Sequence, residues 1–142
     1  MKDGNSLFFR HSQQSGESVK MSEAYFFDTY ALIEIIKGSK NYEKYKDAKV
    51  VTTLLNLMEL HYSTMKEFGK ENALMFFNEL RGFMIEFGET DIINANYFKH
   101  KQGSNISYVD ALGYVLSVKN GVKFLTGDKD FENVDGVEFV RG

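Results

Sequence analysis

The chain has 142 residues, of which 43% are hydrophobic and 15% aromatic, and its formal net charge is −3. This length favours a single domain, and the apolar content is sufficient for a core, so the composition excludes a disordered chain. Cysteine is absent, which excludes disulfides and thiolate metal sites and is compatible with a reducing cytoplasm. No apolar stretch is long enough to span a membrane, and we expect a cytoplasmic protein.

Residues 1–20 differ in composition from the rest of the chain. Their one apolar run, Leu7-Phe8-Phe9, is too short for a secretory signal, and Ser, Gln and Gly follow it. We interpret residues 1–20 as a flexible leader, a tag remnant or a misplaced start, with Met21 as a candidate true start. The folded domain is then expected at residues 21–142.

From residue 24 onward, short apolar runs alternate with helical patterns. Strands are predicted at 24–27, 49–52, 122–126 and, at an edge, 137–140, with a brief one at 91–93. Helices are predicted at 29–37, 54–68, 71–87, 94–101 and 107–119, with a short one in the polar stretch after Gly38. Strands separated by helices imply right-handed crossovers. We therefore predict an α/β fold, a three-layer α/β/α sandwich with a short, mainly parallel sheet.

Four carboxylates stand where such a fold would place a site. Asp28 and Asp128 follow predicted strands, and ligands bind at the carboxyl ends of parallel strands. Glu59 and Asp110 fall on predicted helices.

Each of these acids also has an ordinary explanation. Asp28 can cap the next helix, and Glu59 can be a solvated helix residue. Asp110 can form a capping box with Ser107, and Asp128 can belong to a turn. For any one acid alone, the ordinary role is the more common one.

The residues around the four acids form the motifs FFDTYALIEII, TTLLNLMEL, SYVDALGYVLS and FLTGDKDF, in that order. Together they resemble the PIN-domain family of metal-dependent ribonucleases, and the resemblance covers nearly all of residues 23–140. The chain looks most like the short single-domain branch, the VapC-like toxins of type II toxin–antitoxin pairs. The resemblance implies a PIN-like fold, endoribonuclease activity on RNA, a small antitoxin partner and a homodimer.

The resemblance also assigns roles to individual residues. It places the four acidic positions of the family at Asp28, Glu59, Asp110 and Asp128. It implies supporting positions at Asp130 (an extra carboxylate), Thr126 and Thr29 (hydroxyls) and Asn56 (an organising polar residue).

A divalent metal gives such a cluster its chemical purpose. Carboxylates that converge on one pocket repel each other, and some would stay protonated without a cation. Ligands that are all oxygen favour Mg²⁺ or Mn²⁺ over zinc. We expect Asp28 and Asp128 to ligate the metal, with Asp110 as a direct or water-mediated ligand and Asp130 as a further candidate. Glu59 would orient or deprotonate the attacking water.

Two alternative functions stay open. One is a PIN nuclease of RNA maturation or quality control without a toxin role. The other is a nuclease-like domain that only binds, and the presence of all four acids argues against it. The sequence also leaves DNA open as a substrate.

Two surfaces are open to interpretation as well. Residues 73–87 are richer in Met and Phe than one buried helix face requires, so they belong either to the core or to a partner-binding surface. Arg81 and Arg141 are the only arginines beyond residue 20. A basic rim for phosphate would then rely on lysines, although a solvated surface is their more common role; the candidates are Lys37, Lys40, Lys44 and Lys46.

Overall fold

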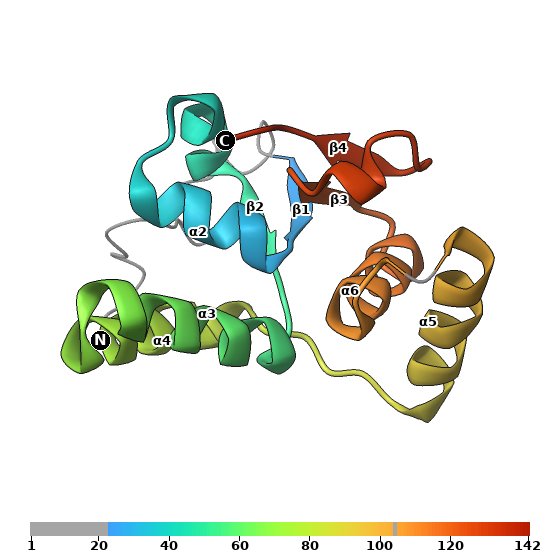
Figure 1. Ribbon diagram of the computed structural model, residues 1–142, viewed down its shortest axis with the longest axis horizontal. Coiled ribbons are helices and arrows are strands. Elements are labelled where there is room, and N and C mark those ends of the chain that lie inside the picture. The colour runs from blue at the N-terminus through green and yellow to red at the C-terminus, as the bar shows by residue number, and fades with distance from the viewer. Residues whose placement is uncertain (1–22, 104) are drawn as a thin grey trace.

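The computed structural model describes residues 23–103 and 105–142, and a four-stranded sheet runs through its centre (Figure 1). The strands are β1 (Ala24–Phe27), β2 (Lys49–Val51), β3 (Lys123–Thr126) and β4 (Val137–Phe139), in the order β2-β1-β3-β4. Every neighbouring pair is parallel. This confirms the predicted parallel sheet. The predicted leader lies outside the described residues and stays a prediction.

Helices cover both faces of the sheet (Figure 1). The first face carries α2 (Thr29–Lys37), the 3-10 segment η1 (Lys40–Asp47), α3 (Leu54–Phe68) and α4 (Lys70–Leu80). The second face carries α5 (Glu89–Gln102) and α6 (Tyr108–Lys119). The predicted α/β/α sandwich is thereby confirmed. Within the described ranges, no helix has both the length and the apolar character needed to cross a membrane.

Alternation along β1 divides the core in two. Tyr25 and Phe27 pack into the first core with α2, whereas Phe26 faces the second core and stacks on Phe124 with ring centroids 5.7 Å apart. Successive side chains of a strand point to opposite faces, and a parallel sheet covered on both sides therefore needs a continuous apolar run. The sequence AYFF meets this requirement.

Gly113 brings α6 close to the sheet. A Cβ at this position would lie 2.7 Å from the Phe26 ring and 3.0 Å from the Phe124 ring. The absence of a side chain thus allows α6 to pack directly on β1 and β3. Because α6 carries Asp110 in its first turn, this close packing also brings Asp110 toward the strand ends.

The predicted helix at 71–87 is too long. α4 ends at Leu80, and the 3-10 segment η2 (Arg81–Phe83) follows. Thr52 then binds the chain on both sides of Met84, through Thr52 N–H to the Phe83 carbonyl (3.1 Å) and Ile85 N–H to the Thr52 carbonyl (2.9 Å). These backbone bonds replace the helical ones, so the chain becomes extended here.

The predicted strand at 91–93 is wrong, because these residues lie in α5. Gly88, which directly follows the predicted helix at 71–87, precedes the first turn of α5. The Gly88 N–H donates to the Asp91 carboxylate at 2.9 Å, which satisfies a backbone donor at the helix start. A local capping contact therefore decides the structure of this apolar pair, Ile92-Ile93.

Asp91 also joins α5 to α6. Lys119 Nζ lies 3.1 Å from Asp91 Oδ1, and Asp91 is 7% exposed. The Gly88 N–H, and after it Lys119, lowers the pKa of Asp91 below its usual 3.8. Since the pKa is lower in the folded chain, ionised Asp91 stabilises the fold above that usual value, and the contribution is lost as the pH falls through the folded-state pKa.

We predict that Asp91→Asn lowers the free energy of unfolding by about 1 kcal/mol at pH 7. The difference from wild type should shrink as the pH falls below about 4, because wild-type Asp91 then becomes protonated as well. Thermal melts from pH 3 to pH 7 measure both effects. Glu67→Gln, on the exposed face of α3, is the control; an equal loss in both variants would contradict the assigned contact.

Candidate active site

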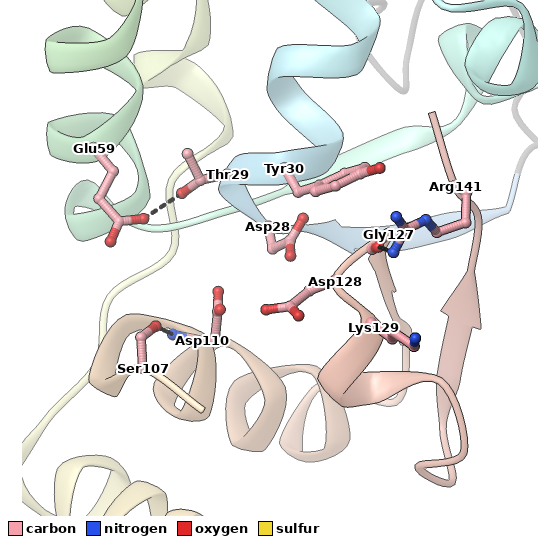
Figure 2. A pocket seen from close by; sticks show the side chains of 10 residues that line it. All are labelled: Asp28, Thr29, Tyr30, Glu59, Ser107, Asp110, Gly127, Asp128, Lys129 and Arg141. Atoms are coloured by element: carbon pink, nitrogen blue, oxygen red, sulfur yellow. Dashed lines mark hydrogen bonds between the residues drawn. The ribbon is translucent and has the colours of Figure 1, made fainter. Parts of the chain in front are cut away.

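A pocket of about 460 Å³ lies at the carboxyl ends of β1 and β3 (Figure 2). Side chains reach it from the starts of α2 and α6, from α3, from the segment after β3 and from the end of the chain. The lining residues are Asp28, Thr29, Tyr30, Glu59, Ser107, Asp110, Gly127, Asp128, Lys129 and Arg141. The structure therefore brings the four predicted acids together in one pocket.

Asp28 is the most deeply buried of these acids, with 1% of its surface exposed. It caps α2, because its Oδ1 accepts the Ala31 N–H at 2.8 Å. Burial raises the pKa of Asp28 well above its usual range, and the nearby charges of Asp110 and Asp128 raise it further. Hydrogen bonds from Thr126 and the Ala31 N–H oppose this effect. Without a cation nearby, burial and the neighbouring acids therefore disfavour the ionised form of Asp28.

Asp110 lies in the first turn of α6, opposite Asp28 (Figure 2). The Ser107 hydroxyl caps this helix by accepting the Asp110 N–H at 3.1 Å. Burial, followed by the charges of Glu59 and Asp128, raises the pKa of Asp110 to about 7. Asp110 thus changes charge near neutral pH in the metal-free protein.

Glu59 is held by a series of polar side chains. The Thr29 hydroxyl donates to Glu59 Oε1 at 2.6 Å, and Asn56 Nδ2 donates to the Thr29 hydroxyl at 3.2 Å. Asn56 is fully buried, and its Oδ1 accepts the Thr53 hydroxyl at 2.7 Å. The predicted supporting residues Thr29 and Asn56 therefore orient Glu59, and Thr53 adds to them.

Asp128 turns back on the chain after β3. Its N–H donates to the Thr126 hydroxyl at 3.0 Å, and its Oδ1 accepts the Asp130 N–H at 3.0 Å. The buried Thr126 side chain also forms a hydrogen bond with Asp28, so it connects Asp28 with Asp128. Asp130, predicted as an extra ligand, is exposed and does not line the pocket, although its charge contributes to the raised pKa of Asp110.

The chemistry of the donors fits a hard divalent cation, since they are carboxylate oxygens whose mutual repulsion such an ion would relieve. Their arrangement is not yet a coordination sphere. Across residues 23–103 and 105–142, no group of three or more His, Cys, Asp or Glu side chains could hold a metal ion as they stand.

Two cations that the sequence motifs did not indicate also line the pocket, Lys129 and Arg141. The lysines considered for a basic rim, at 37, 40, 44 and 46, are not among the lining residues. Lys46 instead pairs with Glu43 at 3.8 Å, and Lys44 lies over the Tyr45 ring. No sequence motif marks Arg141 as a pocket residue, because the path of the segment after β4 brings it there.

We predict that Asp110→Asn stabilises the metal-free protein by about 1 kcal/mol at pH 8, with part of the repulsion screened by solvent. The raised pKa of Asp110 means that its contribution to stability is present below pH 3.8 and is lost as the pH rises toward about 7. The advantage of the variant should accordingly disappear near pH 4. Melting temperatures in EDTA measure it, with Asp135→Asn as a control, and a pH-independent difference would contradict the prediction.

Several solved structures have a fold similar to this one. A toxin–antitoxin complex from Klebsiella pneumoniae has a TM-score of 0.66 at 18% identity and covers 81% of this chain and 96% of that chain. DNA-bound VapBC from Salmonella typhimurium has a TM-score of 0.62 at 16% identity, and the match covers 82% of this chain and 96% of the Salmonella chain. VapBC2 from Rickettsia felis, bound to a DNA fragment from its promoter, has a TM-score of 0.64 at 17% identity, and the match covers 82% of this chain and 98% of the Rickettsia chain. At such identities the likeness shows the fold alone.

The family itself is shown by sequence. No match to this chain was found among curated proteins. The model of the PIN domain family, however, matches residues 25–137, which is most of the chain and includes all four acids. The chain therefore belongs to the PIN domain family, and this membership supports a nuclease, that is, a hydrolase acting on nucleic acid.

Proposed function

We propose that the chain is a metal-dependent endoribonuclease that acts in the cytoplasm as the toxin of a type II toxin–antitoxin pair. The observation that carries this proposal is the convergence of Asp28, Asp110 and Asp128 with Glu59 at the carboxyl ends of β1 and β3. Four acids in one pocket destabilise the metal-free protein, as the raised pKa values of Asp28 and Asp110 indicate. Such an arrangement is useful when a cation and a phosphate enter together.

In this proposal Asp28, Asp110 and Asp128 hold Mg²⁺ or Mn²⁺, and Asp130 is an outer carboxylate. A bound divalent cation supplies positive charge that stabilises the reacting phosphate and lowers the pKa of the attacking water. Glu59 orients that water or accepts its proton. Thr29 is a positioning residue, because its hydroxyl donates to Glu59 at 2.6 Å and so limits the directions in which the carboxylate can point.

The alternative functions differ in what they require of the pocket. A PIN nuclease of RNA maturation or quality control would use the same residues without a toxin role. A domain that only binds would not need Asp28 to be buried beside other acids, so the raised pKa of Asp28 favours an enzyme.

We predict metal-dependent cleavage of RNA that Asp28→Asn and Asp110→Asn each reduce by about a hundredfold or more, because each substitution removes a carboxylate from the proposed metal site. The assay incubates labelled tRNA, ribosomal RNA fragments and single-stranded DNA with Mg²⁺, Mn²⁺ or EDTA. Cleavage in Mg²⁺ or Mn²⁺ but not in EDTA is expected.

The control for this assay is Asp135→Asn, an exposed aspartate outside the pocket, which should cut at the wild-type rate. Cleavage that persists in EDTA, or folded pocket variants that cut like wild type, would contradict the proposed metal role. Preferential cutting of the DNA would overturn RNA as the substrate.

An apolar surface on α3 and α4 supports a protein partner, and we propose that a small antitoxin covers it. Leu54, Met58 and Tyr62 recur every fourth residue on α3 and are 53%, 59% and 57% exposed. Leu74 and Met75 on α4 are exposed as well. Phe76 and Phe83 are buried, so the Met- and Phe-rich segment at 73–87 serves both the core and this surface. Side chains spaced in this way suit an amphipathic helix.

We predict that the protein binds a small protein encoded next to its gene, and that Met58→Glu weakens this complex at least about tenfold by placing a charge in the apolar contact. Calorimetry measures the affinity of this complex. Light scattering measures the molar mass, which for the expected homodimer is twice the 16.3 kDa of one chain. Ile92→Glu on α5, also at an exposed position, is the control. Equal weakening by both variants would remove the α3–α4 surface from the proposal.

A further inference from the structure

The charges around the pocket are unevenly placed. Four of its lining residues are acids, and Lys129 and Arg141 are the cations among them. Within the described residues, neither cation forms an ion pair. A nucleic-acid strand that approaches four carboxylates is repelled unless cations meet its phosphates. These two side chains are placed to do so.

Arg141 is held in place at the pocket. Its Nη1 donates to the Gly127 carbonyl at 3.2 Å. Gly127 also lets Tyr30 and the backbone of Val140, the residue before Arg141, pack against it, since a Cβ there would lie 2.2 Å from the Tyr30 ring and 2.5 Å from the Val140 carbonyl oxygen. A guanidinium has five N–H donors, so most of them stay available to a phosphate.

The backbone around Arg141 is fixed on both sides. Tyr42, which is fully buried, donates its hydroxyl to the Val140 carbonyl at 2.7 Å. Asn41 Nδ2 donates to the Arg141 carbonyl at 2.9 Å, and the Gly142 N–H donates to the Tyr30 hydroxyl at 3.0 Å. These contacts attach the segment after β4 to α2 and η1. Arg141 thereby has a prepared position, which reduces the entropy lost when a ligand binds.

The two cations occupy one side of the pocket (Figure 2). Arg141 and Lys129 lie beside Gly127 and Asp128, whereas Glu59 lies on the far side, beyond Asp28 and Asp110. A phosphate held by Arg141 is therefore displaced from the centre of the carboxylate cluster, where the reacting phosphate would sit.

We propose that Arg141, with Lys129 beside it, binds a backbone phosphate that flanks the cleaved bond and so sets the path of the nucleic-acid strand across the pocket. The inference rests on the proposed function, since it assumes that the acids mark the reacting phosphate. Arg141 acts on substrate binding, and the acids act on the reaction. Loss of Arg141 should therefore change the binding constant and KM, whereas loss of an acid should change kcat.

The test measures binding of a fluorescently labelled single-stranded RNA by anisotropy in EDTA, over a range of salt concentrations. Arg141→Ala should weaken binding about tenfold and reduce the slope of log K against log salt by about 0.7, the value for one lost phosphate contact on a single strand. Arg141→Lys keeps the charge but loses the planar fork, so it should recover part of the affinity and the full slope. Lys129→Ala should weaken binding in the same direction.

Arg81→Ala is the matched control, because Arg81 is exposed on η2, away from the pocket, and its loss changes the net charge equally. It should leave the affinity and the salt slope at wild-type values. In Mg²⁺ or Mn²⁺, Arg141→Ala should raise KM about tenfold with kcat within about twofold of wild type. Melting temperatures confirm that each variant is folded.

Three results would overturn the inference: no binding by wild type, equal effects of the two arginine substitutions, or a lower kcat with unchanged KM and salt slope. The last result would place Arg141 at the reacting phosphate. If wild-type protein binds RNA but cuts no nucleic acid, the proposed enzyme fails, and the anisotropy data still decide whether Arg141 binds phosphate.

Discussion

The repulsion among carboxylates at the end of the sheet is the constraint around which this structure is arranged. Asp28 is almost fully buried, Asp110 and Asp128 face it, and burial together with these charges raises its pKa. A fold gains nothing in stability from such a grouping. Its position at the carboxyl ends of β1 and β3, where parallel sheets place their sites, gives the repulsion a chemical use in binding a cation with a phosphate.

Helix starts supply much of the precision of this site. Asp28 caps α2, Ser107 caps α6, and Thr53 caps α3 through the Asn56 N–H at 3.3 Å. Each capping contact orients the first turn of a helix that also carries a pocket residue. The ordinary roles of these polar residues and their proposed roles in the site are therefore compatible, because the same hydrogen bonds that begin the helices also direct the acids.

Contacts between distant segments also position the residues of the pocket. Gly113 lets α6 approach Phe26, which moves Asp110 toward Asp28, and Gly127 lets the end of the chain lie against Tyr30. The buried hydroxyl of Tyr42 holds this end through the Val140 carbonyl. The pocket thus depends on close backbone approaches between segments that are nearly a hundred residues apart along the chain. Its cationic side exists only because of them.

The sequence by itself determined the layered α/β architecture, most strand and helix positions and the four acids, because apolar periodicity, capping residues and motif order are local properties. Tertiary structure decided the rest. Thr52 ended the helical path after Leu80, the ion pair of Asp91 with Lys119 joined α5 to α6, and Asp130 was left outside the pocket. Arg141 entered the pocket, while the lysines near residue 40 did not. No local pattern reports such placements, since each depends on which distant segment packs alongside.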